Sequence, residues 1–137
     1  IFHKTNKEQE ELIDDILDTI GLYGKKHQNS AALAHGEKQW LEIGMLLAQK
    51  PRLMLLDEPV AGMGRAETEK TGELLKKIAK DCTMIVVEHD MEFVRDYSSK
   101  VTVLHEGAIL DEGSMADVQK NQKVIDVYLG RGGERDA

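Results

Sequence analysis

The sequence has one cysteine, no long apolar run and no block of basic residues, and each absence excludes a class of protein. Cys82 has no second cysteine with which to form an intramolecular disulfide, which fits a reducing compartment. No apolar run approaches the roughly 18 residues that a membrane helix needs, and no secretory hydrophobic region follows the N-terminus. The five histidines show no paired spacing with cysteine, so no zinc site is indicated.

The overall charge is acidic, with a formal net charge of -7 over 137 residues. This balance argues against nucleic acid as a partner, because binding to the phosphate backbone depends on clustered Lys and Arg. A hydrophobic content of 41% is enough for a core in one domain or in a piece of one. The chain begins with Ile1 instead of Met, so we expect that an upstream segment has been removed.

The sequence is organised around an apolar run that ends in two acids, Leu53 to Leu56 followed by Asp57, Glu58 and Pro59. Such a run predicts a short parallel strand buried on both faces. Ligands of open α/β sheets sit at the carboxyl ends of strands, so the two carboxylates are well placed to hold a metal ion and to steer a water molecule. The alternative is that acidic residues simply end a strand.

A second apolar run, Met84 to Val87, follows a helix expected over about residues 65–80, which buries Leu74, Leu75 and Ile78. Strand, helix and strand in this order imply a right-handed crossover and a parallel sheet. We therefore expect His89 at the same sheet edge as Asp57 and Glu58. A single histidine after a strand is usually structural, but one beside a carboxylate pair can orient a phosphate.

Two helices are expected before the first strand. Thr5 and Glu8 have capping-box spacing ahead of an amphipathic helix over about residues 6–20, and a polar loop over 21–32 follows. The second helix begins near Leu33–Gln39 and ends before Pro51. Gly36 in its first turn offers backbone N–H groups that suit an anion; the alternative is that the glycine only eases the turn.

The C-terminal third predicts short elements: a helix capped by Asp90, a hairpin over 101–113 with a Glu106–Gly107 turn, a helix opened by Ser114, and a last helix near 124–129. Residues 130–137 are polar and glycine-rich, and we expect them to be frayed.

With these motifs in this order, the chain resembles the C-terminal part of an ATP-binding-cassette (ABC) transporter ATPase. The resemblance rests on a signature loop at Leu33–Glu37, a Walker B strand at Leu53–Glu58, a D-loop at Ala61–Met63 and a switch residue at His89. It implies an α/β fold: the C-terminal part of a P-loop NTPase core with parallel strands, plus a helical signature subdomain. The implied parts are residues 1–50 (helical subdomain), 51–114 (half of the ATPase core) and 115–137 (C-terminal helices and tail).

The resemblance also implies roles for single residues. Asp57 would position Mg²⁺, Glu58 would polarise the attacking water, and His89 would contact the γ-phosphate of ATP. The signature residues and the D-loop would meet ATP held by a partner subunit in a head-to-tail dimer; they are Ala34, His35, Gly36, Glu37, Ala61, Gly62 and Met63. Phosphoryl transfer asks a protein mainly for positioning and charge stabilisation, which these groups can supply.

Further expectations follow from the family. Partners would be a second ABC ATPase subunit, transmembrane permease subunits and, indirectly, a periplasmic or extracellular solute-binding protein, with no nucleic acid. The location would be cytoplasmic, at the inner face of the cell membrane. Within the family the chain most resembles the subunits of branched-chain amino-acid and urea importers, and residues 37–47 and 58–63 look closest to the urea branch.

Three signature residues depart from the family's usual pattern: Ala34 replaces Ser, His35 replaces Gly, and Glu37 replaces Gln. The urea-like branch tolerates the histidine. Ala34 lacks a hydroxyl that could donate to a phosphate, and Glu37 places a negative charge beside it. We therefore expect weaker nucleotide sandwiching than in a Ser/Gln version.

The phosphate-binding loop is missing from this sequence, since the closest Gly-Lys pair, Gly24–Lys25, has Thr19 where the first glycine should be. We expect this chain alone to bind ATP poorly, to hydrolyse it negligibly, and to expose apolar sheet surface that promotes association.

Two alternative functions stay open. One is a non-enzymatic dimerisation or coupling module, and the other is the head of a chromosome-maintenance or DNA-repair ATPase, although no heptad run precedes the signature.

Overall fold

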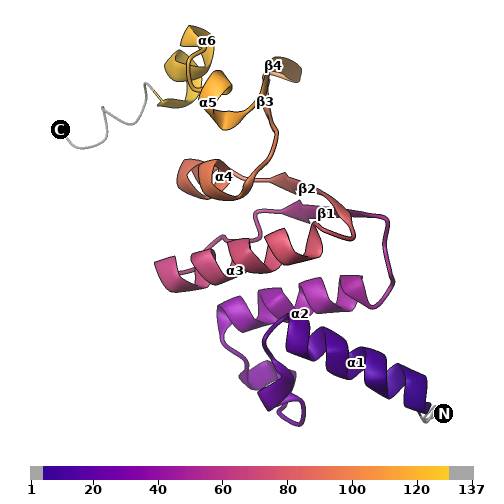
Figure 1. The fold of residues 1–137 in the computed structure, drawn as a ribbon. Coiled ribbons are helices and arrows are strands. Elements are labelled where there is room, and N and C mark those ends of the chain that lie inside the picture. Colours follow the sequence, from indigo (N-terminus) through magenta and orange to yellow (C-terminus); the bar gives the residue numbers. More distant parts are fainter. Residues whose placement is uncertain (1–4, 130–137) are drawn as a thin grey trace. The chain divides into compact units, whose positions relative to one another are not determined.

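The computed structural model describes residues 5–129, and the chain divides into two compact units, residues 1–88 and 89–137 (Figure 1). The first unit carries the elements α1 (Lys7–Thr19), α2 (His35–Leu47), β1 (Leu53–Asp57), α3 (Arg65–Ile78) and β2 (Thr83–Val87). Two short 3₁₀ turns, η1 (Tyr23–Lys25) and η2 (Ser30–Ala32), lie in the expected loop between α1 and α2. The expected three-part division of the chain stays a prediction.

Helix α1 begins one residue later than the sequence indicated. The predicted capping pair Thr5 and Glu8 is wrong, because Asn6 takes the cap: its Oδ1 accepts a hydrogen bond from the Gln9 N–H at 2.8 Å. The Gln9 side chain returns the bond by accepting from the Asn6 N–H at 3.0 Å. Asparagine is among the best N-cap residues, and this reciprocal pair satisfies two backbone donors.

The ribbons of α1, α2 and α3 lie next to one another in that order (Figure 1), and side-chain contacts join each neighbouring pair. Helix α1 meets α2 at Gly44, where a Cβ atom would lie 2.7 Å from Ile20 Cδ1, so only a glycine admits the isoleucine. Helix α2 meets α3 through the buried Trp40, whose indole N–H donates to Thr71 Oγ1 at 2.8 Å. The Lys70 ammonium lies 3.9 Å from the centre of the Trp40 ring, which adds a cation–π contact.

Strands β1 and β2 form the predicted parallel pair, in register from Leu53 beside Thr83 to Asp57 beside Val87. The prediction that β1 is buried on both faces is wrong. Met54 and Leu56 are buried, whereas Leu55 and Ile85 are 66% and 55% exposed. Side chains alternate across a strand, and α3 lies along only one face of this sheet (Figure 1).

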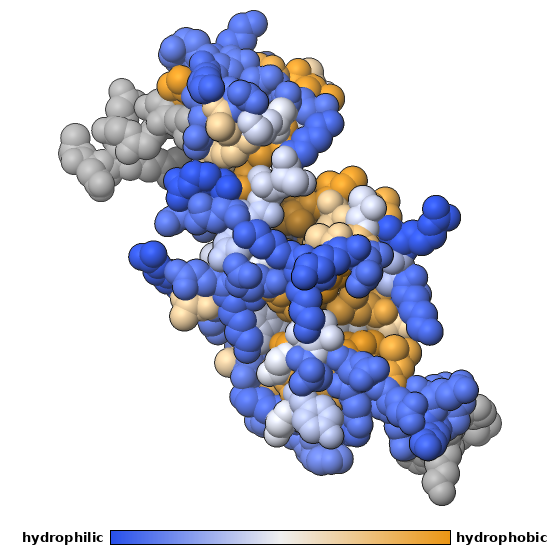
Figure 2. Space-filling view, viewed as in Figure 1, coloured by the Kyte–Doolittle hydropathy of each residue, from blue (hydrophilic) through white to orange (hydrophobic). Residues whose placement is uncertain are grey.

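The exposed side chains confirm the expected apolar sheet surface. Figure 2 shows apolar surface in the region where β1 and β2 lie in Figure 1. The exposed apolar residues of the two strands are Leu53, Leu55, Ile85 and Val87.

The second unit contains the short elements that were predicted. They are α4 (Met91–Tyr97), β3 (Val101–His105), β4 (Ala108–Gly113), α5 (Met115–Val118), α6 (Gln122–Val124) and a π-helical segment, η3 (Ile125–Leu129). Asp90 caps α4 by accepting from the Phe93 N–H at 3.0 Å, and β3 and β4 form the predicted antiparallel hairpin. The expected fraying of 130–137 lies outside the described residues.

Membrane crossing can be assessed for residues 5–129. Every helix in this range is too short or too polar to span a bilayer.

Candidate functional site

The two predicted acids lie at the carboxyl end of β1, where the strand turns sharply. Asp57 is the last strand residue, is exposed, and pairs in register with Val87. Glu58 has φ of +46°, a left-handed conformation that few non-glycine residues adopt. Its N–H still bonds to the Val87 carbonyl at 2.9 Å, so both strands fix its backbone. Strained backbone of this kind is typical of functional sites.

The loop from Glu58 to Gly64, here called the 58–64 loop, contains the predicted D-loop residues Ala61, Gly62 and Met63. Its ends are held by two glutamates. The Val60 N–H donates to Glu88 Oε1 at 3.1 Å, and the Gly64 N–H donates to Glu67 Oε2 at 3.2 Å. Neither glutamate stands out in the sequence as a site residue. The spacing of Glu67, three residues after Gly64, could have revealed the second contact.

The signature turn, Ala34–Glu37, forms the N-terminus of α2. Ala34 is the N-cap residue with an extended backbone, and Ala34 and His35 are exposed. Gly36 is buried, and a Cβ atom there would lie only 2.7 Å from Glu67 Oε1. The glycine therefore leaves room for the Glu67 side chain beside the turn, and the choice between an anion site and a residue that only eases the turn stays a prediction.

The expected charge of Glu37 is compensated within the chain. Its Oε1 lies 2.6 Å from Lys25 Nζ, and its Oε2 accepts from the Ala34 N–H at 3.1 Å. The Lys25 ammonium, followed by the Ala34 N–H, holds the pKa of Glu37 below its ordinary value. Lys25 was noticed in the sequence only as part of a failed phosphate-loop match, and no local spacing joins it to Glu37.

The signature turn and the 58–64 loop are brought together by one side chain. His35 Nε2 lies 2.9 Å from the Ala61 carbonyl oxygen. The first unit therefore gathers the signature turn, the two acids and the D-loop residues that the sequence singled out. His89 belongs to the second unit, so its expected proximity to Asp57 and Glu58 stays a prediction.

The fit of Mg²⁺ depends on Asp57. Within residues 5–129, no group of three or more His, Cys, Asp or Glu side chains could hold a metal ion by itself. Mg²⁺ usually binds through one or two carboxylates together with water and substrate phosphates, so an exposed aspartate beside a nucleotide is a sufficient protein ligand. The residues present fit Mg²⁺ arriving with a phosphate.

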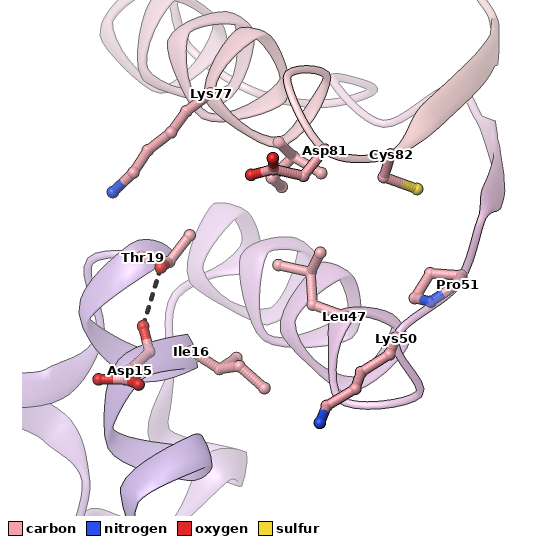
Figure 3. Close-up of a pocket in the computed structure, with 10 residues that line it drawn as sticks. Asp15, Ile16, Thr19, Leu47, Lys50, Pro51, Lys77, Asp81 and Cys82 are labelled. Atoms are coloured by element: carbon pink, nitrogen blue, oxygen red, sulfur yellow. Dashed lines mark hydrogen bonds between the residues drawn. The ribbon is translucent and has the colours of Figure 1, made fainter.

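A separate hollow of about 410 Å³ lies between the ends of α1, α2 and α3 (Figure 3). Thr19, Lys77 and Asp81 line it, and the Thr19 hydroxyl donates to the Asp15 carbonyl at 2.8 Å. No predicted site residue lines this hollow, so the candidate site is the surface formed by the signature turn and the 58–64 loop.

Comparison with known families agrees with these motifs. The family model described as "ABC transporter" matches residues 2–61, and the model described as "Branched-chain amino acid ATP-binding cassette transporter" matches residues 112–134. The chain belongs to the ABC transporter family. The predicted family is therefore confirmed, and so is its α/β fold.

Curated relatives of this ABC protein include transport ATP-binding proteins. The high-affinity branched-chain amino acid transport ATP-binding protein BraF of Pseudomonas aeruginosa is 31% identical over 94% of this chain and 51% of the relative. LivG of Escherichia coli, with the same description, is 33% identical over 83% of this chain and 46% of the relative. The methionine import ATP-binding protein MetN of Histophilus somni is 33% identical over 89% of this chain and 36% of the relative.

Solved ABC structures share the fold. MJ1267, an ATP-binding cassette of an ABC transporter in its ADP conformation, matches 94% of this chain and 53% of its own length, with a TM-score of 0.83 and 26% identity. CbiO1 of Clostridium perfringens matches with a TM-score of 0.79 and 26% identity over 95% of this chain and 54% of its own. The chain thus spans about half the length of BraF and of these structures.

Proposed function

We propose that this chain supplies the Walker B, D-loop and signature portions of an ATP-binding and ATP-hydrolysing subunit of an ABC importer. The observation that carries the proposal is the His35–Ala61 contact at 2.9 Å, which joins the signature turn to the loop that begins at Glu58. In a chain of this family, these are the surfaces expected to meet the phosphates of ATP.

Each predicted site residue has a distinct role in the proposal. Asp57 holds Mg²⁺, which supplies positive charge to the phosphates when it is bound. Glu58 orients and polarises the attacking water, and His89 contacts the γ-phosphate. Ala34 to Glu37 and Ala61 to Met63 face ATP on a second subunit in a head-to-tail dimer. Phosphoryl transfer through such groups depends on position and charge more than on covalent chemistry.

The transported solute in this proposal is a branched-chain amino acid or urea. The names of BraF and LivG and the family match at residues 112–134 support the first. The sequences of residues 37–47 and 58–63, which look closest to the urea branch, support the second. The BraF fusion described below is expressed in strains that lack their own ATP-binding subunit for one solute or the other. Restored uptake of only one of the two solutes would identify it as the transported solute.

The proposed partners are a second ABC ATPase subunit and transmembrane permease subunits, with a solute-binding protein acting through the permease. The working place is the cytoplasmic face of the cell membrane. The relatives' names as transport and import ATP-binding proteins support this assembly.

The chain alone should be inactive, because its sequence contains no phosphate-binding loop of the Gly-x-x-x-x-Gly-Lys-Ser/Thr type. The test compares the 137-residue chain with a fusion in which the portion of BraF N-terminal to the matched region precedes this chain. We expect Mg²⁺-dependent ATP hydrolysis by the fusion and none by the chain. A folded fusion without hydrolysis would favour the non-enzymatic coupling module.

The ion pair that offsets the Glu37 charge changes the expected cause of weak ATP binding between two subunits. Lys25 offsets the carboxylate charge, so the missing hydroxyl at Ala34 becomes the main reason for weak contact with a partner's ATP. In the fusion, Ala34→Ser should strengthen ATP-dependent dimerisation more than Glu37→Gln does. Sedimentation in the presence of ATP measures the dimerisation of both variants. Equal dimerisation by the Ala34→Ser fusion and the unmutated fusion would show that the missing hydroxyl does not weaken the contact.

A further inference from the structure

The contact between His35 and the 58–64 loop links positions 26 residues apart in the sequence. Because the Ala61 carbonyl can only accept, His35 Nε2 must carry the proton and donate it. The family's usual glycine at this position has no side chain and could not make this bond. The replacement of glycine by histidine therefore adds a link between the turn and the loop.

Gly62 allows the imidazole to lie against the loop. Its φ of +73° favours glycine, and a Cβ atom there would lie 3.3 Å from His35 Nε2. A larger residue at 62 would both strain the backbone and crowd the ring. The loop geometry and the histidine are matched to each other.

Backbone hydrogen bonds connect this contact to Glu58. The Ala61 N–H donates to the Glu58 carbonyl at 3.1 Å, and the Glu58 N–H donates to the Val87 carbonyl at 2.9 Å. The His35 ring thus bonds to the Ala61 carbonyl, while the Ala61 N–H bonds to the Glu58 carbonyl. Movement of the ring away from Ala61 would release one of the constraints on the turn at Glu58.

The other end of the loop contacts α3, which in turn bonds to α2. Met63 Sδ lies 3.2 Å from Thr71 Oγ1, and that fully buried hydroxyl accepts the Trp40 indole N–H at 2.8 Å. Trp40 and His35 both belong to α2, so α2 contacts the loop directly through His35 and indirectly through Thr71 of α3. Of the two, only the His35 bond lies at the surface, where it can be removed without opening the core.

We propose that His35 is a positioning residue that fixes the 58–64 loop, and with it Glu58, to the N-terminus of α2. The signature turn and Glu58 of one subunit then keep a constant relative position. The loop contact stands on its own geometry, while its consequence for ATP hydrolysis rests on the proposed function.

Amide hydrogen exchange on the 137-residue chain tests the contact directly. His35→Gln keeps an N–H donor at a similar reach, and His35→Met keeps the volume without a donor. We expect the Ala61 and Met63 amides to exchange roughly two- to tenfold faster in His35→Met, as the loss of one hydrogen bond predicts, and to stay near native rates in His35→Gln. The exposed His27→Met is the matched control and should change neither amide.

The unfolding temperature of each variant is measured alongside, since a general loss of stability would speed exchange throughout the first unit. If His35→Met does not fold, His35→Asn takes its place, because the shorter asparagine side chain does not bring its N–H donor to the Ala61 carbonyl. Equal exchange at Ala61 in the donor and non-donor variants overturns the proposal.

The catalytic consequence is measured in the BraF fusion. His35→Met should lower kcat roughly two- to tenfold with little change in KM, and His35→Gln should restore kcat. Equal kcat in the two variants would contradict positioning of Glu58. Absence of hydrolysis in the unmutated fusion would instead count against the proposed function, and the exchange experiment alone would then decide the His35 contact.

Discussion

Ala34 occupies the N-cap of α2 without a side chain that can cap. Its backbone has the extended conformation of an N-cap residue, yet no side-chain bond reaches the first-turn donors. We predict that Ala34→Ser raises the free energy of unfolding by about 0.5–2 kcal/mol, because the hydroxyl would accept from one of these N–H groups. Urea unfolding measures the change. Ala48→Ser, at the C-cap of the same helix, is the control, and an equal gain there would disprove the capping explanation.

The Lys25–Glu37 ion pair makes stability depend on pH. Lys25 lowers the pKa of Glu37 in the folded chain below its ordinary value of 4.5, to which unfolding returns it. The stabilisation is therefore complete above about pH 4.5 and is lost as the pH falls through the lowered folded pKa.

Lys25→Met should consequently destabilise the chain near neutral pH and have little effect in strong acid. Urea unfolding at about pH 6 and at successively lower pH values measures the difference, since the carboxylate loses its charge as the pH falls through its lowered folded pKa. Lys38→Met, an exposed lysine of the same helix as Glu37, should show no such pH dependence. A Lys25→Met effect of the same size at every pH value would show that the ion pair contributes nothing.

At the scale of elements, the packing of α1 on α2 depends on Gly44. A Cβ atom there would meet Ile20 Cδ1 at 2.7 Å and Ile16 Cγ2 at 3.1 Å. We predict that Gly44→Val lowers the free energy of unfolding by about 1–3 kcal/mol through overpacking. Gly24→Val is the matched control, because nothing lies within 4 Å of its added Cβ. Thermal unfolding compares the two variants. Equal stabilities would show that the α1–α2 contact accommodates a larger side chain at position 44 without loss of stability.

The elements were largely predictable from periodicity and end signals. Both strands of the parallel pair, the hairpin and α2 were located to within about two residues, because apolar runs and turn residues mark them locally. The cap of α1 was misplaced because Thr5 and Asn6 are adjacent good caps, and only the bond to Gln9 decides between them. Burial of both faces of β1 failed because the apolar run does not reveal how many layers cover the sheet.

The candidate site was predictable in its residues but not in its contacts. Asp57, Glu58 and the signature turn stand out in the sequence through their positions after an apolar run and at a helix start. The bonds from His35 to Ala61 and from Lys25 to Glu37 join separate loops and helices, so no local spacing announces them. The same reason hid Glu88, whose carboxylate holds the Val60 N–H.

At the scale of the whole molecule, the exposed sheet face should drive association. Leu55 and Ile85 are neighbours in register and are 66% and 55% exposed. We predict that the chain self-associates as its concentration rises and that Leu55→Lys together with Ile85→Lys suppresses this, since paired charges oppose apolar contact. Light scattering over a concentration series measures the mass.

Met45→Lys is the control for this prediction, because Met45 is 64% exposed on α2 and away from the strands. It should leave association unchanged. A natural chain that stays monomeric at all concentrations would show that the sheet face is not adhesive.

The most direct test of the account is the effect of Glu58→Gln on nucleotide turnover in the BraF fusion. Glutamine keeps the size of the side chain but removes the carboxylate that is proposed to polarise water. We predict that hydrolysis falls at least about a hundredfold, the lower range of a lost general base, while ATP binding persists and ATP-bound dimers accumulate. Unchanged turnover in Glu58→Gln would contradict the account.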